Sequence, residues 1–213
     1  MTSVSGVESV SGLPVLRSRR VVLRQPMPAD VAARVEVADD PETHRMYGGS
    51  AETWRHTAYT EDEAAARAER HLLQDISNVR PFVIAALVWS DGRPVDEPEG
   101  RYIGGARLHE IRWEDRRARL AIGIFDRRFW SQGYGSEAIR LLLRYGFEDL
   151  DLHRIDLRVL EYNLRAIRAY EKCGFVREGV ERETALVDGE WHGDVIMSIL
   201  KHEFRAEPWA ADA

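Results

Sequence analysis

Residues 129–138 read Phe-Trp-Ser-Gln-Gly-Tyr-Gly-Ser-Glu-Ala, and they join an expected strand to the clearest helical pattern in the chain. Glycine at 133 and 135 allows the backbone to adopt positive φ and to approach a ligand closely. The first N–H groups of the following helix lack intrahelical acceptors and carry the positive end of its dipole, so a pyrophosphate could bind there. The same glycines could instead only permit a sharp corner. A dinucleotide fingerprint is excluded, because it needs a third glycine where Ala138 stands.

Working outward, the helix after this stretch is expected over residues 136–148, where Ile139, Leu142, Leu143 and Phe147 share one face. Strands are expected at 15–25, 81–89, 102–113, 117–125, 154–160, 175–186 and 192–202. Further helices are expected at 29–37, 61–73 and 165–172, with loops at 40–53 and 90–100. This order combines hairpins with one parallel strand–helix–strand passage. The expected fold class is α+β (mixed α/β), a mostly antiparallel mixed sheet of about seven strands flanked by about four helices.

Length and composition favour one domain. The chain has 213 residues and a formal net charge of −6, which argues weakly against sequence-independent nucleic-acid binding. Cys173 is the only cysteine, so no intrachain disulfide can form, and a cytoplasmic location is expected. No apolar run approaches the ~20 residues of a membrane helix. We expect tails at 1–14, which lacks the order of a signal peptide, and at 205–213, around a domain at 15–204.

A second informative stretch covers residues 163–175 and contains Asn163 and Tyr170. Asn163 stands at a strand–helix junction, where asparagine often serves only as an N-cap. Tyr170 shares a helical face with Ala166 and Ile167, so it can be only a core aromatic. Taken alone, the residues favour these structural interpretations over functional ones.

Three blocks in register resemble the GNAT acetyltransferase superfamily, and most closely its branch of ribosomal-protein N-terminal and spermidine acetyltransferases. The blocks are residues 129–138, residues 152–159 (Leu-His-Arg-Ile-Asp-Leu-Arg-Val), and residues 163–179 with Tyr170-Glu-Lys and Gly174-Phe175. Residues 21–24 and 28–30 also look like the family's first strand and helix. The resemblance spans most of the expected domain and implies a GNAT fold, in which two parallel strands splay apart.

The resemblance also implies a cofactor and a reaction. The family transfers an acetyl group from acetyl-CoA directly to a primary amine and needs no metal. Its loop before the third helix binds the CoA pyrophosphate through backbone amides. That role falls here on Gln132, Gly133, Tyr134, Gly135 and Ser136.

The pantetheine arm of CoA lies between the splayed strands in this family. This assigns backbone contacts with pantetheine to Ile124, Phe125 and Asp126. Asn163 would hydrogen-bond to the pantetheine, and Tyr170 would lie near the thioester sulfur. With an ordinary pKa near 10, the Tyr170 phenol stays protonated at neutral pH and can donate to the leaving thiolate.

The general base stays unassigned. A primary ammonium must lose a proton before it can attack, and a carboxylate can accept that proton. Many relatives have a Glu for this task at the position where this chain has Ala121. Glu110, Glu114 and Asp126 are carboxylates in the neighbourhood. We expect Glu137 to be an exposed residue of the first helical turn, where negative charge is favourable.

Several other residues carry weaker signals. Trp130 stands where many GNAT proteins have Arg or Gln, although this branch often has Trp there. Arg127 and Arg128 could help to hold a CoA phosphate or could form only a solvated turn. Cys173 is interpreted as structural, and no histidine pair has metal-ligand spacing.

The acceptor depends on the segment in which relatives build their acceptor pocket, which here contains His44, Met46, Tyr47, Trp54 and Tyr59. These side chains could line a pocket or pack the core. A protein N-terminus, a polyamine or another small-molecule amine, such as an amino acid or an amine-bearing antibiotic, stays open as the acceptor. Two alternatives also stay open: a non-catalytic acyl-CoA-binding regulatory module, and transfer of another acyl group such as succinyl. A homodimer formed through a sheet edge or the C-terminal strands is a further hypothesis, and neither nucleic acid nor membrane is expected as a partner.

Overall fold

The computed structural model describes residues 13–38, 40–49, 62, 66, 78–89, 91–96 and 99–206. Its strands are β1 (Leu16–Arg17), β2 (Val21–Arg24), β3 (Arg80–Ala86), β4 (Arg101–Arg112), β5 (Arg117–Ile124), β6 (Arg154–Leu160), β7 (Val176–Val187) and β8 (Glu190–Leu200). Its helices are α1 (Asp30–Ala38), α2 (Pro41–Met46), α5 (Tyr134–Arg144) and α6 (Leu164–Lys172). A 3₁₀ turn, η1 (Arg127–Phe129), precedes α5, and a π turn, η2 (Tyr145–Asp149), follows it.

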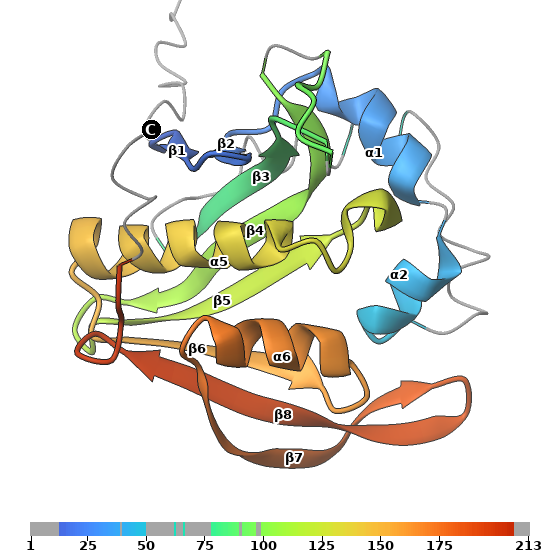
Figure 1. The fold of residues 1–213 in the computed structure, drawn as a ribbon. Helices are drawn as coiled ribbons and strands as arrows, with labels where there is room; N and C mark the ends of the chain where they lie inside the picture. The colour runs from blue at the N-terminus through green and yellow to red at the C-terminus, as the bar shows by residue number, and fades with distance from the viewer. Residues whose placement is uncertain are drawn as a thin grey trace, which may run out of the picture.

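The strands form one mixed sheet in the order β1-β2-β3-β4-β5-β6-β8-β7 (Figure 1). Neighbouring strands are antiparallel except β5 and β6, which are parallel. The parallel pair follows from the connection through α5, because a strand–helix–strand passage returns the chain in the same direction. The expected α+β class and the mostly antiparallel sheet are confirmed.

Two expectations near the N-terminus were wrong. The strand expected at 15–25 is a small hairpin, because the Ser18 amide donates to the Val21 carbonyl at 2.9 Å and the Val21 amide to Ser18 Oγ at 3.0 Å. The loop expected at 40–53 contains α2, which begins with Pro41 behind an Asp40 N-cap. The helix expected at 61–73 lies outside the described residues except for 62 and 66, and so do most residues of the two expected tails.

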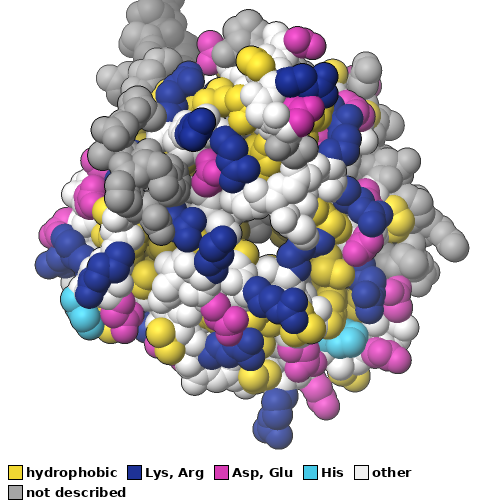
Figure 2. Space-filling view, viewed as in Figure 1, with side chains coloured by type: hydrophobic (Ala, Val, Ile, Leu, Met, Phe, Trp, Pro, Cys, Tyr) yellow, Lys and Arg dark blue, Asp and Glu magenta, His cyan; other side chains and the backbone are white. Residues whose placement is uncertain are grey.

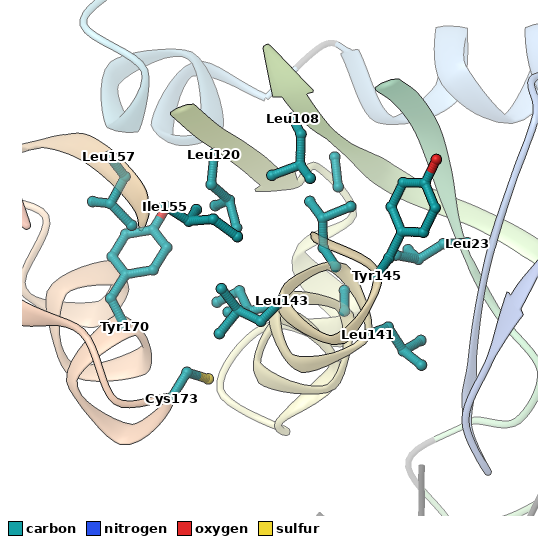
Figure 3. Close-up of a cluster of buried hydrophobic side chains, with 14 of the residues drawn as sticks. Leu23, Leu108, Leu120, Leu141, Leu143, Tyr145, Ile155, Leu157, Tyr170 and Cys173 are labelled. Atoms are coloured by element: carbon teal, nitrogen blue, oxygen red, sulfur yellow. The ribbon is translucent and has the colours of Figure 1, made fainter. Parts of the chain in front are cut away.

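Strand alternation divides the core between the two faces of the sheet. The larger cluster lies under α5, where Ile139, Leu142 and Leu143 are buried on the face expected from the sequence (Figure 3). A smaller cluster on the opposite face places Val37 of α1 against Val22 and other residues of the sheet. Helices α5 and α1 therefore cover opposite faces of the sheet.

The middle of the sheet opens into a gap. β6 pairs with β5 only at Arg117↔Arg154, Ala118↔Ile155 and Arg119↔Asp156. Beyond Arg119, β5 stays paired with β4 and β6 stays paired with β8 to the end of each strand. Each strand is therefore held by its outer neighbour while the two inner edges separate, and this separation positions the candidate site.

Candidate functional site

A cavity of about 530 Å³, here called the splay cavity, occupies the gap between β5 and β6. Residues 120–124 of β5 and 158–160 of β6 form two of its walls, and the loop before α5 and one face of α6 complete it. Among the site residues predicted from the sequence, those lining this cavity are Ile124, Gly133, Gly135, Ser136, Asn163 and Tyr170. Phe125, Asp126, Gln132 and Tyr134 are not part of its lining.

The loop before α5 presents unused backbone donors. Gly133 is the N-cap with φ of 89°, a left-handed conformation that favours glycine. The first intrahelical bond runs from the Glu137 amide to the Gly133 carbonyl at 3.0 Å, so the amides of residues 134–136 precede the helical ladder. A Cβ on Gly135 would meet only Ile124 Cγ1, at 3.6 Å. The helix N-terminus therefore offers N–H groups beside the cavity, as an anion site requires.

The side chains of Gln132 and Tyr134 serve the loop itself. Tyr134 is fully buried, donates from its hydroxyl to the Val88 carbonyl at 2.7 Å and packs edge-on against Phe129. Gln132 Nε2 donates to the Arg128 carbonyl at 2.5 Å. Any contact of these two residues with a ligand in the splay cavity would therefore come from their backbone.

The structure places Phe125 and Asp126 away from the gap. Their amides both donate to the Ile103 carbonyl of β4, at 2.8 and 3.3 Å. The Asp126 carboxylate is buried and accepts hydrogen bonds from Arg128. Phe125 lines a second cavity and contacts the Tyr47 ring edge-on.

The open edge of β5 carries backbone groups that β6 does not pair. The Ile122 carbonyl accepts from the Tyr47 hydroxyl at 3.1 Å, and the Ile124 carbonyl accepts from Trp130 Nε1 at 2.7 Å. In a strand the N–H and C=O of one residue point to the same neighbour. The amides of Ile122 and Ile124 therefore face the gap, where they can stabilise an oxyanion.

Tyr170 reaches the gap from α6. Figure 3 shows its ring directed toward Leu120 of β5 and toward Ile155 of β6, where the two strands begin to separate. The side chain is 6% exposed, and burial raises the pKa of its phenol above the ordinary value. The phenol is therefore protonated at neutral pH.

Asn163 is both a cap and a lining residue. Its Oδ1 accepts from the Ala166 amide at 3.2 Å, which confirms the N-cap interpretation. Its Nδ2 donates to the Met46 carbonyl at 3.3 Å and so ties α6 to α2 across the cavity.

Three cations of α6 also line the splay cavity, and the sequence analysis missed them. Arg165, Arg168 and Lys172 lie on one helical face, which their spacing of three and four residues would have indicated. The guanidinium of Arg165 lies 3.5 Å from the centroid of the Trp130 ring, and burial lowers its pKa. Figure 2 shows Lys and Arg side chains, in dark blue, around the middle of the face that carries α5 and α6. This face suits an anionic ligand.

The basic pair before the loop is engaged elsewhere. Arg127 pairs with Glu42 at 2.8 Å, and Arg128 pairs with Asp126 at 2.7 Å. Glu137, expected to be exposed, is instead mostly buried, with 14% of its side chain accessible. It forms an ion pair with Arg20 and accepts from Ser18 Oγ at 2.8 Å, because the β1–β2 turn packs over the start of α5.

The three carboxylates that the sequence places in the neighbourhood, Glu110, Glu114 and Asp126, are not part of the lining of the splay cavity. Glu110 pairs with Arg119 at 3.1 Å, and Glu114 is exposed. The titratable groups that do line it include His109 and Asp194. Burial first, and then the Arg107 charge, lower the pKa of His109 below its ordinary value, so its imidazole is neutral at pH 7. The alternation of side chains along residues 102–113 indicates which face of the strand His109 lies on. It does not show that His109 lies opposite Arg119, which depends on the pairing of β4 with β5.

A second cavity of about 260 Å³, here called the β4 cavity, adjoins the first. The two share Tyr47, Ala121, Ile122 and Gly123 as a common wall. Tyr47 thus lines both, whereas Met46 lines only the splay cavity and His44 lines neither. The expected acceptor-pocket residues Trp54 and Tyr59 lie outside the described residues.

The described residues offer neither a metal site nor a membrane-spanning helix. They contain no group of three or more His, Cys, Asp or Glu side chains that could hold a metal ion. None of the helices among them has the length and apolar character needed to cross a membrane.

Comparison with known proteins identifies the family. Residues 20–176 match the acetyltransferase (GNAT) domain family. Spermidine N(1)-acetyltransferase of Escherichia coli K12 is 33% identical over 55% of this chain and 63% of its own length. The uncharacterized N-acetyltransferase YoaA of Bacillus subtilis is 29% identical over 88% of this chain and 97% of its own length. The chain spans only 44% to 63% of the first curated relatives it matches.

A solved structure shows the same fold. Spermidine N-acetyltransferase from Vibrio cholerae, in complex with CoA and spermine, has a TM-score of 0.67 and 24% sequence identity. The match covers 86% of this chain and 96% of that one. Since the family match spans most of the chain and includes both motif-bearing segments up to α6, the chain belongs to the GNAT acetyltransferase family.

Proposed function

We propose that this protein is an acetyl-CoA-dependent N-acetyltransferase that moves the acetyl group directly to a primary amine. One observation carries this proposal: the splay cavity brings together helix N-terminal amides, unpaired strand amides and the buried Tyr170 phenol. These are donors for a pyrophosphate, for an oxyanion and for a leaving thiolate. The family membership of the chain supports the same activity.

Acetyl-CoA fits this cavity as an anionic, elongated co-substrate. Its pyrophosphate would bind at the amides of residues 134–136, with Arg168 and Lys172 of α6 close enough to line the same space. The described residues give Arg168 and Lys172 no ion-pair partner. Pantetheine would lie between the unpaired edges of β5 and β6, with Asn163 beside it.

The residues of the chain then have distinct tasks in the transfer. The neutral amine attacks the thioester carbonyl, and the Ile122 and Ile124 amides stabilise the negative charge that develops on its oxygen. The C–S bond breaks as Tyr170 gives its proton to the departing sulfur. His109 accepts the proton lost by the amine, and exchange with solvent returns both groups to their starting protonation states.

His109 replaces the carboxylate that many relatives carry at the position of Ala121. It lines the splay cavity and is neutral at pH 7, as a proton acceptor must be. The acceptor amine would approach through the β4 cavity, because only the shared wall of Tyr47, Ala121, Ile122 and Gly123 separates it from the thioester position.

The test is release of CoA thiol from acetyl-CoA across a panel of amines. The panel contains amino acids, peptides with free N-termini, spermidine and aminoglycosides. We expect release above the no-acceptor rate with at least one class, and a much lower rate with Tyr170→Phe. Tight binding of acetyl-CoA without turnover of any amine would instead favour the non-catalytic binding module, and turnover only with succinyl-CoA would change the acyl group.

A further inference from the structure

The β4 cavity has an unusual charge composition. Among the described residues that line it, the charged side chains are Arg34 of α1 and Arg107 of β4, and no carboxylate is present. The remaining lining is apolar or aromatic apart from glycine backbone. An acceptor bound here would therefore meet positive charge and no negative charge from these residues.

Both arginines lack a partner among the residues that the structure describes. Neither Arg34 nor Arg107 forms a hydrogen bond or ion pair with another described residue. Arginines close by are all engaged, since Arg101 pairs with Glu36 at 2.8 Å and Arg128 with Asp126 at 2.7 Å. Arg34 is half-buried, so its guanidinium loses hydration without gaining a counter-ion, whereas Arg107 is exposed and keeps contact with water. An anionic ligand group would supply the missing partner.

The pairing of β4 with β5 places one of these two arginines next to a small residue that carries no charge. Arg107 lies directly opposite Ala121 on the neighbouring strand, so the two side chains share a face about 5 Å apart at Cβ. The small side chain of Ala121 leaves the space beside Arg107 open, and the described residues that line the cavity place no carboxylate there.

Gly105 enlarges the same space. Gly105 and Gly123 are also opposite each other, and both line the β4 cavity. A Cβ on Gly105 would approach no closer than 3.7 Å to any other residue, so the floor of the cavity is open there. The volume of about 260 Å³ suits a ligand of amino-acid size or the end of a peptide.

Building on the proposed function, we infer that the acceptor amine carries a carboxylate of its own, which Arg107 and Arg34 bind in the β4 cavity. The acceptor class is an amino carboxylate, and a polyamine is excluded. Planar guanidinium groups bind carboxylates through paired hydrogen bonds, which also fix the direction from which the amine reaches the thioester. A polyamine would place additional positive charge against two unpaired arginines.

This inference separates the chain from its named relatives. Spermidine is the substrate that the Escherichia coli relative is named for. The positive charge of the β4 cavity predicts that this chain prefers a different acceptor from that relative, although both belong to one family. The acetyl-CoA site does not depend on these two arginines, so the two parts can be tested separately.

The first experiment compares matched acceptors. Each common L-amino acid is assayed beside its carboxamide, which keeps the α-amine but lacks the carboxylate, and spermidine is assayed alone. We expect at least one amino acid to be acetylated with a kcat/KM at least tenfold above both its carboxamide and spermidine. Rates are compared at equal concentrations of neutral amine, because amidation lowers the amine pKa.

The second experiment removes the charges. Arg107→Gln and Arg34→Gln should each raise KM for the preferred amino acid roughly 10- to 100-fold, as expected for a lost hydrogen bond between charged groups. Neither change should alter the KM for acetyl-CoA. At a pH well above the ordinary histidine pKa of 6.5, where His109 is neutral with or without the Arg107 charge, the kcat/KM for the carboxamide should fall far less than that for the amino acid. Arg107→Lys should recover part of the affinity, and Arg93→Gln, which removes an exposed arginine paired with Asp91, is the matched control.

The outcomes distinguish this inference from the proposed function. Acetylation of spermidine, or of the carboxamides as efficiently as the amino acids, would overturn the inference and leave the acetyltransferase intact. The inference would also be overturned if Arg107→Gln lowered kcat/KM equally for the amino acid and for its carboxamide. The inference is also overturned if calorimetry shows that acetyl-CoA binds but no amine that carries a carboxylate is bound or acetylated. Absence of acetyl-CoA binding would contradict the proposed function itself.

Discussion

The Tyr47 hydroxyl donates a 3.1 Å hydrogen bond to the Ile122 carbonyl, at the wall where the splay cavity and the β4 cavity meet. A Cβ on Gly123 would overlap this hydroxyl, so the glycine allows Tyr47 to sit against the strand. Burial of the hydroxyl raises the pKa of Tyr47, although much of the ring stays exposed. Helix α2 is thereby fastened to β5 at the point where the proposed donor and acceptor meet, and this contact bears on each test of the site.

Gly135→Val tests the helix N-terminus as the pyrophosphate site. The new Cβ meets no backbone and only Ile124 Cγ1, so the domain should fold, while the added methyl groups obstruct the amides of residues 134–136. We expect acetyl-CoA to bind roughly tenfold or more weakly, a cost of about 1.4 kcal/mol or more, measured by calorimetry. Gly179→Val is the control, because a Cβ there would have no neighbour within 4 Å. Unchanged affinity in Gly135→Val would remove the loop from the binding site.

Tyr170→Phe tests proton donation to the thiolate. Since burial keeps the phenol protonated, its loss should lower kcat roughly 100-fold while KM for acetyl-CoA changes little. Tyr134→Phe is the matched control, since among the described residues its hydroxyl donates to the Val88 carbonyl alone. That change should cost about 1 kcal/mol of unfolding free energy and leave kcat unchanged. Full turnover by Tyr170→Phe would take Tyr170 out of the mechanism.

His109→Gln tests the proton acceptor. The pKa of His109 lies below its ordinary value of 6.5, so kcat at saturating acceptor should fall only as the pH drops below 6.5 and the imidazole becomes charged. The variant should lose roughly 100-fold in kcat together with this acid limb. His202→Gln, at an exposed residue, is the control. If kcat of His109→Gln still falls as the pH drops below 6.5, the titrating group is not His109.

The lowered pKa of His109 also makes the stability of the folded protein depend on pH. The folded protein binds the His109 proton less readily than the unfolded chain, so this residue stabilises the fold above pH 6.5. That contribution is lost as the pH falls from 6.5 through the lower folded pKa. His109→Gln should therefore flatten the dependence of the unfolding midpoint on pH in this range, which urea titrations at several pH values would measure.

The sequence predicted the sheet and the start of α5 well, because both depend on local patterns. Alternation located the strands, and glycine before a strong apolar face located the start of α5. Helix α2 was missed because Gly48 and Gly49 pointed to a loop, although Asp40 followed by Pro41 is a helix-start signal.

The candidate site could be predicted only in part, because much of it depends on how elements pack. The cations of α6 share a face that the sequence displays, but only the packing of α6 turns Arg168 toward the splay cavity. His109 was overlooked for the same reason, since its role requires the pairing of β4 with β5. The charge of the β4 cavity likewise joins Arg34 and Arg107 from elements far apart in the chain.

Asp30→Asn tests the anchor of α1, the helix that carries Arg34. Arg24 donates to both Asp30 oxygens, at 2.8 and 2.7 Å, and both side chains are at least nine-tenths buried. The Asp30 carboxylate also accepts from the Met27 amide at 2.7 Å. Removing one partner leaves a buried charge unpaired, so we expect unfolding free energy to fall by about 3 kcal/mol in urea titrations. Asp91→Asn, which breaks an exposed pair with Arg93, should change the unfolding free energy far less. Equal effects of the two changes would show that α1 is held by its apolar contacts alone.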